Sequence, residues 1–397
     1  MSVSIGLKRT EKIMRILISG GGTGGHIYPA LSVAMQLQNE YKTDVLYLGS
    51  DDGLETELIP AAGLRFARIK AGKLQRFVSW RTMTGIARVP VGMVQALGIV
   101  RNFHADAAFT SGGYVAVPAG LAARLNGVPL LMHQQDVPPN LSNRLLAPLA
   151  TRISVAFADS QRYFPSGKTL HLGNPVRQAI LDARLIQPQQ ARTTLGLAPD
   201  LPLLLVTGGS QGARHLNQTV CRALPDLLTY SQVLQISGRN LFEETRALSE
   251  STLAALPVET RQRYRLVPYM DAEMPLALQA AELVVCRAGA ATLSELAVLG
   301  KPAILVPLPP ALGDSPQEAN AAMFERKQAA EVIRNSDLKP ETLVERVKNN
   351  ITSYVKLKAM AEAVGELARP TATQDIVEVV VEMARGVKTS KREVISI

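Results

Sequence analysis

Short apolar runs alternate with longer segments of mixed polarity along most of the chain. The runs are MRILISG, TDVLYLG, ADAAFTSG, PLLMHQQ and RISVAF, followed by LPLLLVTGG, SQVLQISG, YRLVPYM, AELVVCRAG and PAILVPL. Nearly continuous apolar strands separated by helical segments are typical of parallel sheets that helices cover on both faces. The pattern therefore predicts an α/β fold.

The two halves of the chain begin alike. Residues 16–31 (ILISGGGTGGHIYPAL) and residues 203–218 (LLLVTGGSQGARHLNQ) each place a strand, a glycine loop and a helix in that order. We therefore expect two Rossmann-like, doubly wound domains. Ligands of such sheets bind beyond the carboxyl ends of the strands, so two facing domains would place both glycine loops on one interdomain cleft.

The repeating pattern also indicates where the domains end. It breaks after residues 171–177 (HLGNPVR), where a stretch rich in Pro and Gln follows. We expect an N-terminal domain over residues 14–175 and a C-terminal domain over residues 176–370. The periodicity of QDIVEVVVEMARG predicts a last helix at residues 371–385 that can return to the N-terminal domain. Residues 386–397 are expected to form a basic tail.

Composition limits the class of protein. The chain has 397 residues, 47% of them hydrophobic, which is enough for two cores. Cys221 and Cys286 lie in apolar segments without metal-ligand spacing, which favours buried thiols in a reducing compartment. Residues 1–13 lack the apolar core of a signal peptide, and no apolar run is long enough to span a bilayer. We expect a cytoplasmic protein without a transmembrane segment.

Positive charge is concentrated in the first half. The net charge is +9, and residues 65–101 carry eight basic and no acidic residues, together with Trp80 and many aliphatic side chains. This mixture favours an anionic membrane surface as the partner of Arg65–Arg101. Nucleic acid is the competing partner, but no aromatic-rich stacking platform accompanies the charge, so we expect no nucleic acid. An ordinary solvated helix pair is the structural alternative.

The first glycine loop contains candidate chemistry. Its glycines allow the backbone to approach a ligand closely, and the following helix start offers unpaired N–H groups to a phosphate. His26 lies beside such a ligand and titrates near neutral pH, so it is a candidate general base. A histidine that only caps the helix or orients the substrate is the alternative.

The second half contains three further clusters at expected strand ends: SGRN at 237–240, CRAGAATLSELAVLG at 286–300 and PLPPALGDSPQEANA at 307–321. Together they indicate a nucleotide-sugar pocket. Ala290 permits close backbone approach, and Thr292 and Ser294 can reach phosphate. Glu295 can accept both hydroxyls of a ribose, although an acid near a helix N-terminus is also favoured by the helix dipole alone.

These motifs together resemble the GT-B glycosyltransferases of family 28 type, and within them the N-acetylglucosaminyltransferases of peptidoglycan synthesis. The resemblance runs from Met14 to beyond Glu331. It rests on six motifs in the family's order: GGGTGGHIYPAL, SGGYVAVPAG, GNPVR, GGSQGAR, CRAGAATLSE and the glutamine-containing loop at 307–321. Any one of these motifs is weak evidence, whereas six in order are specific.

The resemblance implies inverting transfer of N-acetylglucosamine from UDP-N-acetylglucosamine to the C4 hydroxyl of the muramyl group of undecaprenyl-linked lipid I, which makes lipid II. It implies an enzyme on the cytoplasmic face of the inner membrane, bound peripherally, with no metal and no redox cofactor. The sequence agrees in that no DxD motif follows a strand, since Asp51 and Asp52 are adjacent. A GT-B transferase for another lipid acceptor and a non-catalytic nucleotide-sugar-binding protein are the alternatives.

Site residues follow from the resemblance position by position. It implies His26 as the base; Thr23, Gly24 and Gly25 facing the acceptor pyrophosphate and the transferred sugar; Arg177, Ser210 and Gln211 at the phosphates and nucleotide; Met270 beside uracil; Glu295 at the ribose; and Gln317 at the donor sugar.

The chain departs from the family pattern at a few positions. It reads HQQD where the family reads HEQN, so Gln134 and Asp136 replace a glutamate and an asparagine and the carboxylate moves by two positions. We expect Asp136 to contribute to substrate binding. Asn140 follows Pro139 where glycine is common, and Pro316 and Glu318 flank Gln317 where the family often has other residues.

Overall fold

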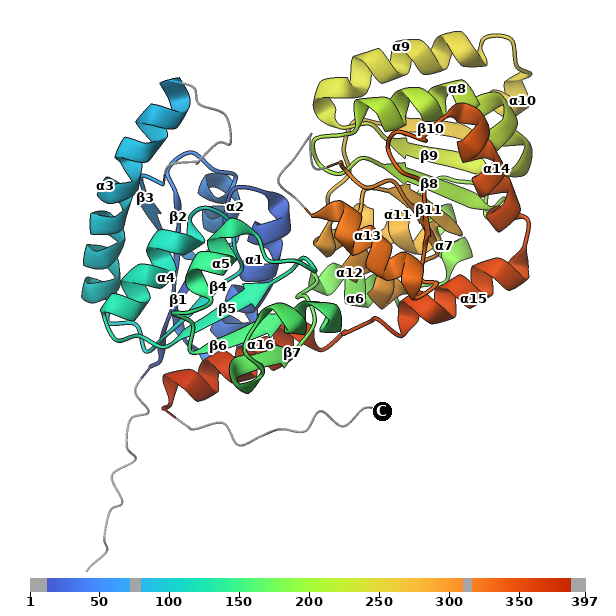
Figure 1. The fold of residues 1–397 in the computed structure, drawn as a ribbon. Coiled ribbons are helices and arrows are strands. Elements are labelled where there is room, and N and C mark those ends of the chain that lie inside the picture. Colours follow the sequence, from blue (N-terminus) through green and yellow to red (C-terminus); the bar gives the residue numbers. More distant parts are fainter. Residues whose placement is uncertain (1–12, 72–79, 310–315, 387–397) are drawn as a thin grey trace, which may run out of the picture.

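The apolar runs form the centres of two parallel sheets, which lie in two domains side by side (Figure 1). This computed structural model describes residues 13–71, 80–309 and 316–386, with side chains of the third helix described from residue 90 onward. The predicted α/β fold class with two Rossmann-like domains is confirmed. No helix in the described ranges is both long enough and apolar enough to cross a membrane.

The N-terminal sheet has seven strands in the order β3-β2-β1-β4-β5-β6-β7. Its strands are β1 (Arg15–Ser19), β2 (Asp44–Ser50), β3 (Arg65–Ile69), β4 (Ala107–Thr110), β5 (Leu130–Gln134), β6 (Arg152–Val155) and β7 (Thr169–His171). Its helices are α1 (Gly24–Tyr41), α2 (Glu55–Ala61), α3 (Trp80–Phe103), α4 (Ala116–Leu125) and α5 (Leu141–Leu146), with 3-10 turns at Ala158–Tyr163 and Ser166–Lys168.

The C-terminal sheet repeats this winding with six strands in the order β10-β9-β8-β11-β12-β13. Its strands are β8 (Leu203–Thr207), β9 (Gln232–Ile236), β10 (Tyr264–Val267), β11 (Leu283–Cys286), β12 (Ala303–Leu305) and β13 (Glu331–Val332). The helices of this domain are α6 (Gln178–Ala183), α7 (Pro188–Thr194), α8 (Arg214–Tyr230), α9 (Phe242–Leu253), α10 (Val258–Arg261), α11 (Met274–Ala280), α12 (Ala290–Leu299), α13 (Gln317–Arg326), α14 (Pro340–Ile351) and α15 (Tyr354–Gly365), with a 3-10 turn at Arg239–Leu241. The last helix of the chain is α16 (Ala372–Ala384).

Each central strand is buried on both faces, which explains its continuous apolar sequence. In β1, Leu17 packs into the cluster beneath α3 and α4, whereas Ile16 and Ile18 pack into the cluster beneath α1 and α16. All three side chains are at most 1% exposed. Fully burying one such side chain stabilises a fold by about 1.5–3 kcal/mol. The strand ends that carry the glycine loops are therefore rigidly placed.

The last helix crosses from the C-terminal domain to the N-terminal one. Figure 1 shows α15 along the C-terminal domain and α16, in red, beneath the N-terminal domain. Helix α16 packs on α1 and β4, with Ile376, Val377 and Val380 fully buried. The chain thus joins the two domains twice, at α6 and again before α16.

Three edge strands were missed by the sequence pattern. Strand β3 (RFARI) contains two exposed arginines among its five residues, and β7 and β13 have only three and two residues. Arg65 of β3 pairs with Asp44 through two contacts of 2.8 and 2.9 Å and lies over the ring of Phe103. Arg65 thus belongs to the edge of the sheet, although the sequence pattern groups it with the basic segment at 65–101.

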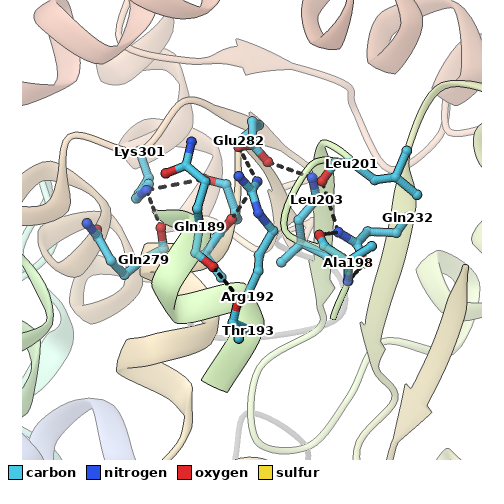
Figure 2. A network of polar contacts seen from close by, with 12 residues as sticks. Gln189, Arg192, Thr193, Ala198, Leu201, Leu203, Gln232, Gln279, Glu282 and Lys301 are labelled. Carbon is cyan, nitrogen blue, oxygen red and sulfur yellow. Dashed lines mark hydrogen bonds and ion pairs between the residues drawn. The ribbon is translucent and has the colours of Figure 1, made fainter. Parts of the chain in front are cut away.

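A polar network lies at the amino ends of β8, β11 and β12 in the C-terminal sheet, away from the glycine loop at the carboxyl end of β8 (Figure 2). Arg192 of α7 is 3% exposed and pairs with Glu282, which also accepts a hydrogen bond from the backbone of Leu203. Lys301 donates to the carbonyl oxygens of Gln279 (2.6 Å) and Ala281 (3.2 Å). The network ties α7, which follows the domain connection, to the sheet.

Candidate active site at the interdomain cleft

The strand orders determine where a site can form. In each sheet the winding reverses between two strands, β1 and β4 in the first and β8 and β11 in the second. Ligands bind at the carboxyl ends of strands at such a reversal. The loops there precede α1 and α8 and also follow β4 and β11. Helices α1 and α12 contact each other, so the two reversal points face one another across the domain boundary.

His26 lies in the first turn of α1 and is fixed by the neighbouring strand β4. Its Nδ1 lies 3.0 Å from the carbonyl oxygen of Ser111, directly after β4, and the Ser111 hydroxyl donates to the His26 carbonyl oxygen at 2.6 Å. A carbonyl oxygen only accepts, so Nδ1 carries the hydrogen in the neutral ring. Nε2 is then the nitrogen with a free lone pair, as a general base requires.

Two further residues complete the setting of the imidazole. The amide nitrogen of Gln135 donates to the same Ser111 carbonyl oxygen at 2.9 Å and thereby lies 3.2 Å from His26 Nδ1. Gly112 follows with φ +103°, and a Cβ there would come within 3.0 Å of the imidazole ring. Only glycine satisfies both the backbone conformation and the close approach.

The electrostatic environment keeps the imidazole neutral. Burial lowers the pKa of His26 below its ordinary value, against the opposing effects of the Asp136 carboxylate and the Ser111 carbonyl. Burial also raises the pKa of Asp136, opposed by the Asn320 amide and by His26. A neutral imidazole beside a carboxylate can accept a proton and then be stabilised as the imidazolium.

The HQQD segment, which spans the end of β5 and the two residues after it, is held by the residues that distinguish it. Gln134 is fully buried and donates to the carbonyl oxygens of Asp136 (2.8 Å) and Pro138 (3.2 Å). A glutamate at this position could not donate either bond, so Gln134 has a structural role in this chain. The Asp136 carboxylate accepts a hydrogen bond at 2.8 Å from Asn320 of α13, in the other domain.

Asn320 joins the C-terminal domain to the HQQD segment of the N-terminal domain. It is fully buried, accepts from the backbone N–H of Val137 at 2.9 Å and donates to the carbonyl oxygen of Ala288 at 3.1 Å. Nearby, Phe157 and Phe324 meet edge to face across the same boundary, with ring centroids 5.9 Å apart. These contacts hold the HQQD loop against the helix that begins at Gln317.

An acid on α2, Glu55, contacts the first glycine loop. Glu55 is fully buried and accepts hydrogen bonds from the backbone N–H (3.0 Å) and hydroxyl (2.6 Å) of Ser50. Its second oxygen lies 3.4 Å from the backbone nitrogen of Gly22. One amide of the loop is therefore already paired within the protein, which leaves the first turn of α1, at Thr23–Gly25, for a ligand.

In the C-terminal domain, Arg177 and Glu295 are paired with each other. Arg177 precedes α6, and its Nη2 and Nε lie 3.1 and 3.3 Å from one oxygen of Glu295 on α12. Its Nη1 lies 3.5 Å from the Asp271 carboxylate. Burial raises the pKa of Glu295, and the Arg177 charge opposes that rise. The two residues implied for phosphate and ribose thus lie in one place.

The second glycine loop is open. Ser210 and Gln211 are exposed between β8 and α8. A cavity of about 320 Å³ lies between Gln211 and residues of the N-terminal domain, which are Gly22, Asp52, Gly53, Leu54, Thr56 and Glu57. The domains therefore share a cleft at their glycine loops.

Five further residues that the sequence predicts for the site are Ala290, Thr292, Gln317, Met270 and Ser294. Ala290 begins α12, Thr292 is partly exposed in its first turn, and Gln317 accepts from the backbone N–H groups of Ala288 (3.2 Å) and Leu308 (3.0 Å). Met270 is 7% exposed and packs in the main core of the domain. Ser294 is 8% exposed and donates back to the carbonyl of Ala290, an arrangement that does not favour phosphate binding.

Sequence reasoning missed several residues that shape the site. Ser111 and Gln135 fix the imidazole, and Tyr28, Asp271 and Asn320 contact the opposite domain. Ser111 and Gln135 stand in the motifs SGGY and HQQD, which offered a signal. Tyr28 and Asn320 also stand in motifs, GGGTGGHIYPAL and the loop at 307–321, but nothing in those motifs indicates a contact with the opposite domain, and Asp271 lies in a segment without such a motif.

Comparison with known proteins places the chain among glycosyltransferases. Residues 16–155 match the Glycosyltransferase family 28 N-terminal domain, and residues 203–377 match the family's C-terminal domain. A crystal structure of MurG from Acinetobacter baumannii is similar, with a TM-score of 0.71 and 29% identity over 93% of this chain and 99% of that one.

Curated sequences are similar over nearly the whole chain. The "UDP-N-acetylglucosamine--N-acetylmuramyl-(pentapeptide) pyrophosphoryl-undecaprenol N-acetylglucosamine transferase" of Desulforamulus reducens is 39% identical over 92% of this chain and 98% of its own length. The protein of the same name from Desulfitobacterium hafniense is 38% identical over 94% of this chain and its own full length. The chain therefore belongs to this family of N-acetylglucosamine transferases and is a glycosyltransferase of family 28.

Proposed function

We propose that this enzyme transfers N-acetylglucosamine from UDP-N-acetylglucosamine to the C4 hydroxyl of the muramyl group of undecaprenyl-pyrophosphoryl-muramyl-pentapeptide, the lipid I of peptidoglycan synthesis, and so makes lipid II. The observation that carries the proposal is the shared cleft. His26 presents a basic nitrogen from one domain, while the Arg177–Glu295 pair lies on the other side. A base for an attacking hydroxyl and a pocket for a nucleotide diphosphate are the two parts that such a transfer needs.

The donor binds to the C-terminal domain. Glu295 accepts hydrogen bonds from the ribose hydroxyls. Arg177 and the loop at Ser210 and Gln211 bind the diphosphate. The N-termini of α8 and α12 point their unpaired N–H groups at the same anion. Gln317, held at two backbone amides, contacts the sugar.

The transfer is a single displacement with inversion. The acceptor hydroxyl oxygen attacks the anomeric carbon of N-acetylglucosamine, the bond from that carbon to the UDP oxygen breaks, and UDP leaves with the electron pair. Nε2 of His26 takes the hydroxyl proton, and Asp136 stabilises the imidazolium that results. The N–H groups of the first turn of α1, at Thr23–Gly25, bind the acceptor pyrophosphate.

The acceptor is lipid-linked, and the N-terminal domain carries the surface that meets the anionic membrane. Val91 and Val94 of α3 are 45% and 70% exposed and lie on one side of the helix, and Arg101 near its end is exposed. Of the other residues of the expected surface, Lys73, Arg76, Trp80, Arg81 and Arg88 lie outside the described side chains, whereas Arg65 and Arg68 lie in β3 and Lys70 directly after it, all three exposed. Flotation with anionic vesicles tests this surface. We expect Val94→Asp to weaken vesicle binding while transfer to a soluble acceptor is unchanged. Vesicle binding equal to that of the unaltered chain would contradict the proposed membrane surface.

The test of the activity is transfer of labelled N-acetylglucosamine from UDP-N-acetylglucosamine to a soluble lipid I analogue. The assay contains a chelator, and analogues lacking the peptide or the pyrophosphate serve as controls. We expect transfer to the complete acceptor. Transfer only to other lipid-linked sugars, or UDP-sugar binding without transfer, would overturn the proposal in favour of another acceptor or a binding protein.

A further inference from the structure

Tyr28 of α1 reaches across the domain boundary to the arginine of the donor side. The guanidinium carbon of Arg177 lies 5.3 Å from the centroid of the Tyr28 ring. The Tyr28 hydroxyl donates to the Asp271 carboxylate at 3.4 Å, and that carboxylate also contacts Arg177. The only aromatic contact of Arg177 recorded for the described residues therefore comes from the opposite domain.

The local sequence makes room for this ring. Tyr28 lies one turn after Gly24, and a Cβ at Gly24 would come within 3.2 Å of the Tyr28 ring. The ring therefore lies against the bare backbone of the first turn of α1. Burial, with Tyr269 and Asp271 adding to it, raises the pKa of Tyr28 above its ordinary value, so the phenol keeps its proton and can donate.

Tyr28 differs in kind from the other partners of Arg177. Glu295 and Asp271 are anions that compete with a phosphate for the guanidinium. A ring face attracts the cation without using its N–H groups, which lie in the guanidinium plane and stay free for an anion. When Glu295 turns to a ribose, the ring can keep Arg177 in place without neutralising it.

We propose that Tyr28 is a positioning residue for the transfer, which holds Arg177 where the donor diphosphate binds. The proposal rests on the role proposed above for Arg177 at the diphosphate. Tyr28 also connects the proposed base with the proposed diphosphate site, because it stands two residues after His26 on the same helix. The leaving group and the base are thus placed relative to each other through one turn of α1.

The experiment is calorimetric titration of the full chain with UDP and, separately, with uridine. Arg177 meets only the phosphates, so a residue that acts through it affects UDP and leaves uridine unchanged. We expect Tyr28→Leu to weaken UDP binding by about fivefold to twentyfold and uridine binding by less than about twofold. Tyr28→Phe keeps the ring and is expected to retain most of the UDP affinity. Tyr41→Leu, at the other end of α1, is the matched control.

A double-mutant cycle with Arg177→Met decides whether Tyr28 acts through Arg177. We expect Arg177→Met to weaken UDP binding, and Tyr28→Leu to add nothing to it. In steady-state kinetics, Tyr28→Leu should raise the KM for UDP-N-acetylglucosamine and leave the acceptor KM unchanged.

The outcomes separate this inference from the proposed function. Additive effects in the cycle, a parallel loss of uridine affinity, or a Tyr28→Phe variant as weak as Tyr28→Leu would each overturn the positioning role while Arg177 keeps its own. If Arg177→Met binds UDP as the unaltered chain does, the proposed diphosphate site itself fails. An unaltered UDP affinity in Tyr28→Leu overturns the inference alone.

Discussion

The two sides of the cleft hold their reactive groups in different ways. His26 is partly buried, which lowers its pKa and favours the neutral ring, and hydrogen bonds with Ser111 fix the imidazole, so its free nitrogen is held in place without any substrate. Arg177 and Glu295 are charged and paired with each other. A buried charge without a partner costs several kcal/mol, whereas a buried neutral imidazole costs far less. A neutral base can therefore be fixed in advance, whereas charges that would recognise an anion pair with each other until the anion binds.

Removal of the preformed base has the largest expected effect. We expect His26→Ala to lower kcat by about 10²–10⁴-fold, because no group then accepts the hydroxyl proton. UDP affinity should stay within about twofold, since the donor side is separate. Rapid-quench transfer assays and calorimetry measure the two quantities. His104→Ala, an exposed histidine just after α3, is the control, and a His26→Ala variant with near-normal kcat would refute the role of the base.

Removal of one charge of the donor pair tests the other side. We expect Glu295→Gln to weaken uridine binding by about tenfold or more, through the loss of hydrogen bonds to a charged group. Binding of inorganic pyrophosphate should instead become stronger, because Arg177 loses a competing anion. Calorimetry with each ligand separates the effects. Weaker binding of both ligands would mean that the pair does not compete with the anion.

The Asp136 carboxylate offers a smaller change on the base side. Its negative charge raises the pKa of His26, so Asp136→Asn should lower that pKa further. The acidic limb of the kcat/KM profile should therefore move to lower pH. We expect kcat to fall by less than about tenfold, because the base itself remains. A pH profile identical to that of the unaltered chain would show that Asp136 does not act on His26.

The network in Figure 2 provides a change outside the cleft, with the smallest expected effect on activity. Burial lowers the pKa of Lys301 from 10.5 to about 8. The unfolded chain therefore holds this proton more tightly, and the stability contributed by Lys301 rises as pH increases from about 8 to 10.5, by up to about 3 kcal/mol. Denaturant unfolding of Lys301→Met at pH 7.5 and 10 should lack this rise, with kcat at pH 7.5 unchanged. An equal rise in both proteins would contradict the buried, shifted lysine.

Much of the fold could be predicted because the central strands are buried on both faces. Runs such as LPLLLVTGG predict the fold class, and the six ordered motifs indicate the family; both are confirmed. The edge strands β3, β7 and β13 escaped because they are short or carry arginines toward solvent. An edge strand needs neither a continuous apolar run nor length.

The motifs suggest candidate site residues one by one but not their arrangement. His26, Arg177 and Glu295 are candidates from their motifs, and the pairing of Arg177 with Glu295 joins residues 118 positions apart. The contact of Tyr28 with Asp271 spans 243 positions. Such pairs depend on how the two domains face each other, and local sequence patterns do not encode that geometry.

A crystal structure with UDP-N-acetylglucosamine bound tests both sides of the cleft at once. We expect Arg177 to leave Glu295 for the diphosphate and to remain against the Tyr28 ring, while Glu295 accepts hydrogen bonds from the ribose hydroxyls. The hydrogen bond between His26 and Ser111 should stay near its 3.0 Å length. An intact Arg177–Glu295 pair in the presence of the donor, with its diphosphate bound elsewhere, would refute the proposed donor site.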